Sequence, residues 1–316
     1  MLKNKKYNLY WDFDTPLHAA CSICEERFII AKHIDSGRTK EFRNITEFWG
    51  SKRTEIGGWL SKQPKKWRRE DFEVIQKSRR NLVPLHKAQE FLKGKIELLK
   101  EQVFCKELKL VVQGKGNYRK KIYKDYKSNR PKEKPIIFKE LKQWFIKEFD
   151  PIIKDGMETD DTISILQHWS YNTFGKDTEY GFVFVDKDLE QTPCWRVNPN
   201  KLGKGIYWID EEYANRVFFE SIISGDTSDA IPGIEYVTEN IWDEYNLKGK
   251  KFFVGKGNAK TLLKDCKTKQ DMVLRVQDIY KEVYNEEWRE KLNINYKLLK
   301  LLEKQNEIKD FPFTKE

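Results

Sequence analysis

The sequence has few of the residues that build disulfide frameworks or membrane spans. Five cysteines occur among 316 residues, an odd number and mostly far apart, which argues against a secreted disulfide framework. No apolar run reaches the roughly 18 residues that cross a bilayer, and the first residues lack the apolar stretch of a signal peptide. We therefore expect a cytoplasmic protein without a membrane partner.

Histidine is also scarce, and the cysteines offer only one close pair. Cys21 and Cys24 have the spacing of a redox or zinc pair, but the other three cysteines form no second pair, so buried thiols are the better interpretation. No nucleophile or ligand pattern involves the four histidines, and we assign no catalytic role to His18, His33, His86 or His168.

Charge, by contrast, is abundant and unevenly distributed. The chain holds 60 Lys+Arg and 50 Asp+Glu, a net charge of +10. Residues 1–150 hold 36 basic and 20 acidic residues, a net of +16, whereas residues 151–316 hold 24 and 30, a net of −6. One region suited to a polyanion and another that gathers carboxylates are expected of a metal-dependent enzyme that acts on nucleic acid.

Alternating strands and helices predict an α/β fold with a central, mostly parallel twisted sheet and helices on both faces. Strands are expected at 7–11, 108–112 and 181–185, and helices at 17–32, 137–149, 162–169, 211–224 and 270–304. A Pro- and Gly-containing junction over 191–205 would separate an α/β core over 1–190 from a mainly helical part over 206–316.

Residues 38–70 combine tryptophans with many cations and leave two interpretations open. They could form a nucleic-acid surface, in which rings and cations meet bases and phosphates. They could equally form a solvated basic excursion with its tryptophans packed underneath. The residues concerned are Trp49, Trp59, Trp67, Arg43, Lys52, Arg53, Lys65, Lys66, Arg68 and Arg69.

Acidic side chains follow or open several of the expected elements. In a parallel sheet the carboxyl ends of the strands meet at one edge, so these groups would come together there. Such a cluster would repel itself unless divalent cations neutralised it, and Mg²⁺ or Mn²⁺ bound through oxygen are the natural candidates. The candidate ligands are Asp12, Glu158, Asp160, Asp161, Asp186, Asp188, Asp226 and Asp229.

The basic segment over 117–131 supplies a complementary set of cations. As a helix it would place Arg119, Tyr123, Tyr126, Lys127 and Arg130 within reach of one stripe. Arginine and lysine can hold phosphates, and tyrosine offers a face on which a base can stack. This segment is therefore a candidate phosphate clamp.

Four motifs occur in order and resemble those of the 5′-nuclease family: Tyr126-Lys-Ser-Asn-Arg-Pro131, Gly156-Met-Glu-Thr-Asp-Asp161, Val185-Asp-Lys-Asp-Leu189 and Gly225-Asp-Thr-Ser-Asp-Ala-Ile-Pro-Gly233. The resemblance implies a PIN/FEN-like fold and a site in which the eight carboxylates hold two Mg²⁺ or Mn²⁺. It also implies that Lys127 and Arg130 engage phosphate, with Tyr126 as a base-stacking neighbour. The family usually carries an acidic residue after the second strand, where this chain has Gln113-Gly-Lys-Gly116; Asp14 is an alternative source of that charge, or a strand-end cap.

The segment over 252–263 has a strand, a Gly-rich turn, Lys-Thr and a helix, the order of a P-loop. A P-loop would require glycines where Val254 and Ala259 stand, so the spacing disfavours an ATPase. The alternative is a helix-hairpin resembling the family's helix-three-turn-helix, which grips duplex DNA and often holds a monovalent cation such as K⁺. Its candidate backbone-contacting residues are Gly255, Lys256, Gly257 and Lys260.

These observations predict a monomeric, structure-selective 5′-to-3′ exonuclease. Its expected partner is double-stranded DNA with a 5′ end or flap, and an RNA–DNA hybrid is a further candidate for primer removal in replication. Stand-alone enzymes of this kind occur in bacteriophages. The alternative is a DNA-binding protein that keeps the fold but has an impaired metal site.

Overall fold

The computed structural model describes residues 5–51, 57–63, 67–130 and 134–314. The chain divides into two compact units. The first comprises residues 1–14, 97–132 and 150–316, and the second comprises residues 15–96 and 133–149. Five residues that the sequence analysis singled out lie outside the described residues: Lys52, Arg53, Lys65, Lys66 and Pro131.

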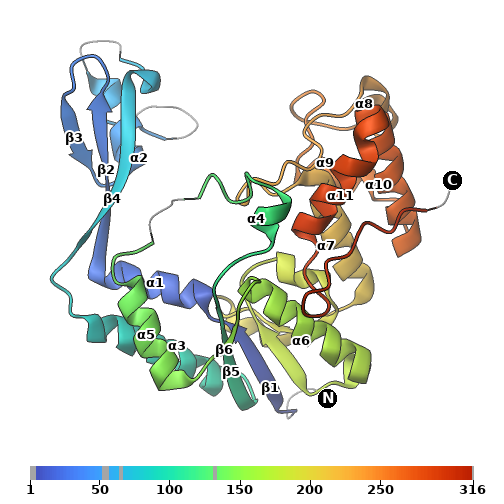
Figure 1. Ribbon diagram of the computed structural model, residues 1–316, viewed down its shortest axis with the longest axis horizontal. Helices are drawn as coiled ribbons and strands as arrows, with labels where there is room; N and C mark the ends of the chain where they lie inside the picture. Colours follow the sequence, from blue (N-terminus) through green and yellow to red (C-terminus); the bar gives the residue numbers. More distant parts are fainter. Residues whose placement is uncertain (1–4, 52–56, 64–66, 131–133, 315–316) are drawn as a thin grey trace. The chain divides into compact units, whose positions relative to one another are not determined.

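The first unit is built on a six-stranded sheet of order β6-β5-β1-β7-β8-β9, of which Figure 1 labels β6, β5 and β1. All neighbouring strands are parallel except β8 and β9. The predicted α/β fold with a mostly parallel sheet is therefore confirmed. The strands are β1 (Tyr7–Asp12), β5 (Cys105–Gln113), β6 (Ile152–Lys154), β7 (Tyr180–Val183), β8 (Cys194–Val197) and β9 (Ile206–Ile209).

Helices flank this sheet and build a second core. Ile163 of α6 packs with Tyr10, Val111 and Phe182 of three adjacent strands. Buried side chains of α7, α9, α10 and α11 form another apolar cluster. The helices of this unit are α4 (Arg119–Ile122), α6 (Thr159–Phe174), α7 (Glu211–Ser224), α8 (Glu239–Glu244), α9 (Lys256–Leu262), α10 (Lys269–Tyr284) and α11 (Trp288–Leu299).

The sheet extends through the expected junction. Residues 191–205 contain β8, and β9 follows at Ile206–Ile209 in antiparallel register with it. Both strands are only four residues long, and Pro193, Pro199 and Gly205 lie beside them. Short strands next to such residues look like a loop in sequence, which is why the pattern suggested a boundary there.

The second unit contains an antiparallel sheet of order β3-β2-β4. The expected helix over 17–32 is correct as far as Cys24 and wrong from Glu25, where β2 begins. Phe28, Ile29 and Ile30 favour a strand, and pairing with both neighbours outweighs the helical spacing. The elements that lie wholly or mainly in this unit are α1 (Asp14–Cys24), β2 (Glu25–His33), β3 (Thr39–Phe42), α2 (Ile45–Trp49), β4 (Phe72–Arg80), α3 (Leu85–Gln102) and α5 (Phe138–Phe149).

The tryptophans of residues 38–70 pack together within this unit. The ring of Trp59 lies 5.3 Å from that of Phe42 and 5.8 Å from that of Trp67, centre to centre. Buried Phe48 completes the cluster, and Lys40 lies over the Trp59 ring. Of the two open interpretations, the structure favours tryptophans packed beneath a basic surface.

Cys21 and Cys24 are both buried free thiols, as predicted, and burial raises the pKa of Cys21 to about 12. Within the described ranges, no helix combines the length and apolar character needed to cross a bilayer.

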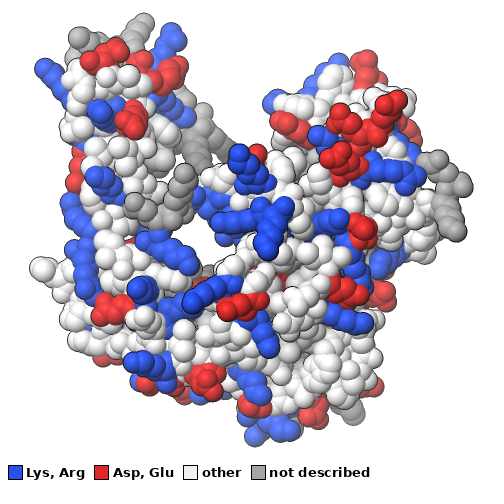
Figure 2. Space-filling model, in the orientation of Figure 1, with Lys and Arg blue, Asp and Glu red and all other residues white. Residues whose placement is uncertain are grey.

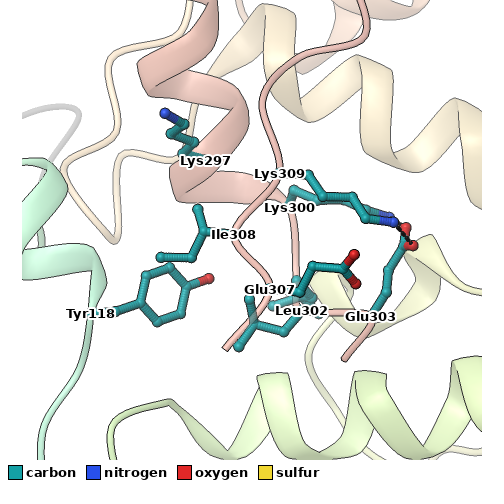
Figure 3. Close-up of a pocket in the computed structure, with 9 residues that line it drawn as sticks. Tyr118, Lys297, Lys300, Leu302, Glu303, Glu307, Ile308 and Lys309 are labelled. Atoms are coloured by element: carbon teal, nitrogen blue, oxygen red, sulfur yellow. Dashed lines mark hydrogen bonds and ion pairs between the residues drawn. The ribbon is translucent and has the colours of Figure 1, made fainter. Parts of the chain in front are cut away.

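His168 of α6 lies near the C-terminal segment that carries Glu303. Glu303 bonds with both Lys300 and Lys309 beside a pocket of about 10 Å³, the space of one water molecule (Figure 3). Burial of Glu303 opposes its ionisation, but the two lysines outweigh it and hold its pKa at about 2. Burial lowers the pKa of His168 to about 4, and the same lysines add to the effect.

This lowered pKa predicts a pH-dependent loss of stability. The unfolded chain takes up a proton on His168 below its ordinary pKa of about 6.5, whereas the folded chain resists protonation down to about 4. The free energy of unfolding should fall by up to about 3 kcal/mol as the pH drops through that window. Urea unfolding of His168→Gln should show a shallower pH dependence than wild type. The exposed-site control His86→Gln should keep the wild-type slope, and equal slopes in all three proteins would contradict the assignment.

Candidate active site

The first group of carboxylates stands at the carboxyl end of the central strands. Asp12 is the last residue of β1, Asp186 follows β7, and Asp160 is in the first turn of α6. Burial raises the pKa of Asp12 to about 7, and the charges of Asp14 and Asp186 add to the effect. Burial likewise raises the pKa of Asp160, with Asp12 and Asp186 as the next causes. These three carboxylates are therefore electrostatic neighbours that repel one another.

A second group lies between β7 and the loop after α7. Burial is the main reason that the pKa of Asp188 is raised to about 7, and the negative charges of Asp186 and Asp226 raise it further. Asp226 accepts hydrogen bonds from the backbone N–H (2.7 Å) and hydroxyl (2.6 Å) of Ser228, which fix the turn. Lys256, at the start of α9, opposes the rise in the pKa of Asp188. Asp186 is common to both groups.

The other three candidate ligands already have cationic partners. Lys127 bonds with Glu158, and Lys127 Nζ lies 3.3 Å from Asp229 Oδ2. Burial opposes the ionisation of Glu158, but Lys127 and Arg119 outweigh it and lower its pKa. Asp161 is fully buried, with no exposed surface. Its side chain is held by hydrogen bonds rather than presented to a ligand.

Arg119 is the partner that holds Asp161. Its guanidinium donates to both oxygens of that carboxylate at 2.6 and 2.8 Å, to Glu158 at 3.3 Å and to the carbonyl of Leu298 at 2.8 Å. Arg119 is only 1% exposed. Arg119 was predicted to contact nucleic acid, but in this structure its guanidinium is buried among groups of its own chain and is not accessible to DNA.

The segment around Lys127 docks on the loop after α7. The Lys127 backbone N–H donates to the Asp229 carbonyl at 2.8 Å, and Asn129 and Arg130 bond with Thr227 and Asp229. Lys127 has a φ of 58°, a left-handed conformation unusual outside glycine. Residues 127–130 are thus joined to residues 227–229, about 100 residues later in the sequence.

Tyr126 is buried in this junction and does not offer a stacking face. It is 4% exposed, and its hydroxyl bonds with Glu158 at 2.7 Å and Asp229 at 3.1 Å. The expected role in base stacking is therefore not available to this side chain as the chain is folded. It acts instead as a polar link between two carboxylates.

The basic segment is mostly not helical. Helix α4 covers only Arg119–Ile122, and turns follow it, so the expected single stripe does not form. Lys120, Lys121 and Lys124 are exposed, and Figure 2 shows basic side chains gathered over α4 and the segment after it. Sequence reasoning passed over these three lysines, although their high local density was the signal that could have found them.

The missing acidic residue after the second strand has a structural explanation. Asp14 accepts the backbone N–H of Gln113 at 3.1 Å and bonds with the hydroxyl of Thr159, so it acts as a cap that ties β5 to α6. A side chain at Gly114 would clash with the backbone of Lys154. Asp155, which sequence reasoning did not include, accepts the backbone N–H of Lys115 at 2.7 Å and places an exposed carboxylate beside this turn.

The segment over 252–263, predicted to form a hairpin, consists of the end of the loop after α8 and of α9, so Lys256, Gly257 and Lys260 are helical. Asn258 fixes it by donating from its side-chain amide to the carbonyls of Lys248 at 3.0 Å and Phe253 at 2.9 Å. Ala259 is fully buried, which agrees with the absence of a P-loop there. Among the predicted backbone-contacting residues, Lys256, Gly257 and Lys260 are exposed and Gly255 is half-buried.

The carboxylate groups have the donor chemistry of a divalent-metal site. Their oxygens are the ligands that Mg²⁺ and Mn²⁺ prefer, and a bound cation would offset the burial and the like charges that together raise the pKa values of Asp12 and Asp188. Over the part of the chain that the structure describes, no group of three or more His, Cys, Asp or Glu side chains is arranged so that it could hold a metal ion as it stands. Metal binding by these residues stays a prediction.

Comparisons with known proteins give a distant structural likeness. No protein-family model matches the sequence, and no curated protein matches it. The structure is similar to a bacteriophage T5 flap endonuclease in a pseudo-enzyme–product complex with DNA and metal ions, at 16% identity and a TM-score of 0.34, over 67% of this chain and 90% of that one. The bacteriophage T5 D15 protein crystallised with metal ions has 16% identity and a TM-score of 0.34. A point mutant of the T5 5′-exonuclease has 14% identity and a TM-score of 0.33. Each of these two alignments covers 67% of this chain and 92% of the other chain.

Proposed function

We propose that this chain is a divalent-metal-dependent 5′ nuclease that hydrolyses phosphodiester bonds of DNA from a 5′ end or flap. The observation that carries the proposal is a set of mutually repelling carboxylates near the carboxyl edge of the sheet, of which Asp12 is buried and Asp160 and Asp188 are half-buried. Asp12, Asp160, Asp186, Asp188 and Asp226 belong to this set. Repulsion of this kind costs stability in a protein without a bound cation, so a functional reason for keeping it is expected.

Within this proposal the five carboxylates would hold the metal ions, and the cation-paired groups would position the substrate. When bound, a divalent ion supplies an activated water and stabilises the leaving oxygen. Lys127 and Arg130 now bond with Glu158 and Asp229, and they would exchange these partners for the scissile phosphate. Glu158 would keep its bond to the Tyr126 hydroxyl during that exchange.

Exposed cations would bind the rest of the DNA through its backbone. Lys120, Lys121 and Lys124 lie after β5, and Lys256 and Lys260 lie on α9. Contacts to phosphates carry little sequence information and weaken as salt rises. We therefore expect recognition of DNA structure rather than sequence; the K⁺ ion at the hairpin and activity on an RNA–DNA hybrid stay predictions.

Replacing Lys127 should slow the chemical step more than it weakens DNA binding. Lys127→Ala removes the amino group that is expected to hold the phosphate, and single-turnover cleavage should slow about a hundredfold. The matched control is Lys124→Ala, an exposed lysine three residues away, which should lose only backbone affinity. Wild-type single-turnover rates in Lys127→Ala would remove this residue from the mechanism.

A further inference from the structure

A second pocket lies at the opposite end of the sheet from the carboxylates. Its volume is about 460 Å³, within the range of roughly 300–1,000 Å³ typical of small-molecule sites. Tyr7, the first residue of β1, lines it, whereas Asp12 is the last residue of that strand. At about 3.3 Å per residue the two positions are about 16 Å apart, so the pocket is separate from the candidate active site.

Aromatic rings form much of its wall. Trp195 of β8 and Trp208 of β9 lie 5.3 Å apart with their rings edge to face, and Tyr7 lies 5.7 Å from Trp195. The indole N–H of Trp195 donates to the Lys176 carbonyl at 3.0 Å and fixes that ring. Trp208 is half-buried and keeps accessible ring surface, whereas the ring of its neighbour Tyr207 lies on the other face of β9 and packs in the core there. Fixed and partly open rings are suited to stacking a planar heterocycle.

The polar groups of the pocket favour an anion. Two lysines and one aspartate line it, namely Lys5, Lys176 and Asp177. Lys5 Nζ donates to the Asp177 carbonyl at 3.0 Å and lies 5.5 Å from the Tyr7 ring centre, which places its charge at the aromatic wall. Lys176 is exposed and can swing toward a ligand.

We propose that this pocket binds a nucleotide, with its base on Trp208 and its phosphate toward Lys5 and Lys176. The nucleotide could come from a free nucleoside monophosphate or from an unpaired end of a DNA strand, because both present the same chemistry. The inference goes beyond the nuclease activity and does not depend on it, since none of the candidate metal ligands lines the pocket.

Binding can be measured on the full chain in EDTA, which removes divalent ions and so prevents cleavage by a metal-dependent nuclease. Calorimetry should show saturable binding of deoxyadenosine monophosphate, and weaker binding of deoxyadenosine, which lacks the phosphate. Trp208→Ala should weaken nucleotide binding about tenfold or more, because stacking one base on an aromatic ring contributes about 1–3 kcal/mol. Lys176→Ala should weaken binding of the monophosphate but not of the nucleoside. The control Lys201→Ala, an exposed lysine outside the pocket, should bind as wild type.

Two results would overturn the proposal. One is no saturable binding at millimolar nucleotide, and the other is binding that Lys176→Ala leaves intact and Lys127→Ala abolishes, which would place the nucleotide at the carboxylate edge. Circular dichroism checks whether Trp208→Ala is folded. If Trp208→Ala is unfolded, the surface variant Lys176→Ala still tests the proposal. If a short deoxyadenosine oligonucleotide displaces the monophosphate, a strand end is the source; if it does not, the free nucleotide is.

Discussion

Asp160→Asn should lose nearly all Mg²⁺-dependent cleavage while it keeps DNA binding. Asp160 lies in the first turn of α6 and shares the repulsion of Asp12 and Asp186. Removing one carboxylate from a divalent-metal site forfeits several kcal/mol of transition-state stabilisation, which corresponds to a loss of about a thousandfold or more in rate. Phosphate contacts by the exposed lysines are untouched, so a band-shift assay in EDTA should give the wild-type affinity.

The same variant should not be less stable than wild type without metal. Burial and like charges raise the pKa of Asp160, so its ionised form costs stability at neutral pH, and the neutral amide removes that cost. Urea unfolding in EDTA should therefore give an equal or higher free energy of unfolding. Asp278→Asn, an exposed aspartate on α10, is the control and should keep full activity. Full cleavage by Asp160→Asn would remove Asp160 from the metal site.

Arg119→Met should be the most destabilising single substitution at the site. The guanidinium compensates the fully buried Asp161 and also bonds with Glu158 and the Leu298 carbonyl. Removing one partner of a buried ion pair leaves an uncompensated charge, and such changes cost about 3–5 kcal/mol. Urea unfolding of the full chain measures the loss.

A graded set of variants separates this effect from a simple change of charge. Arg119→Lys keeps the positive charge but cannot make the two-pronged contact with Asp161, so its stability should be intermediate. Lys120→Met removes an adjacent, exposed cation and should change stability by less than about 0.5 kcal/mol. Equal stability of Arg119→Met and Lys120→Met would contradict the structural role of Arg119.

The sequence predicted the first unit better than the second. The central strands near 7–11, 108–112 and 181–185 were recognisable because buried parallel strands are short apolar runs. The β2–β4 sheet was missed since charged residues such as Arg27 and Lys32 interrupt its strands, which are stabilised by cross-strand pairing and by packing of one face. The region over 117–131 resembles a basic helix in composition, but docking on the loop after α7 holds most of it in turns.

At the site, the expected strand ends predicted where the carboxylates would lie, but not which of them pair with basic side chains. Asp12, Asp186 and Asp188 could be placed at one edge from topology alone. Some carboxylates already pair with basic side chains, and these pairs join segments that are distant in sequence, such as Arg119 with Asp161 and Arg130 with Asp229. Such contacts leave no local pattern in the sequence. For the same reason the burial of Tyr126 could not be foreseen.

The central claim is that the carboxylate edge makes this chain a metal-dependent 5′ nuclease. The most direct measurement incubates wild-type protein with a 5′-labelled DNA duplex in Mg²⁺ and, in parallel, in EDTA. We expect release of short labelled products in Mg²⁺ and none in EDTA, with a band shift in both. A band shift without cleavage in Mg²⁺ or Mn²⁺ would contradict the nuclease and leave a DNA-binding protein.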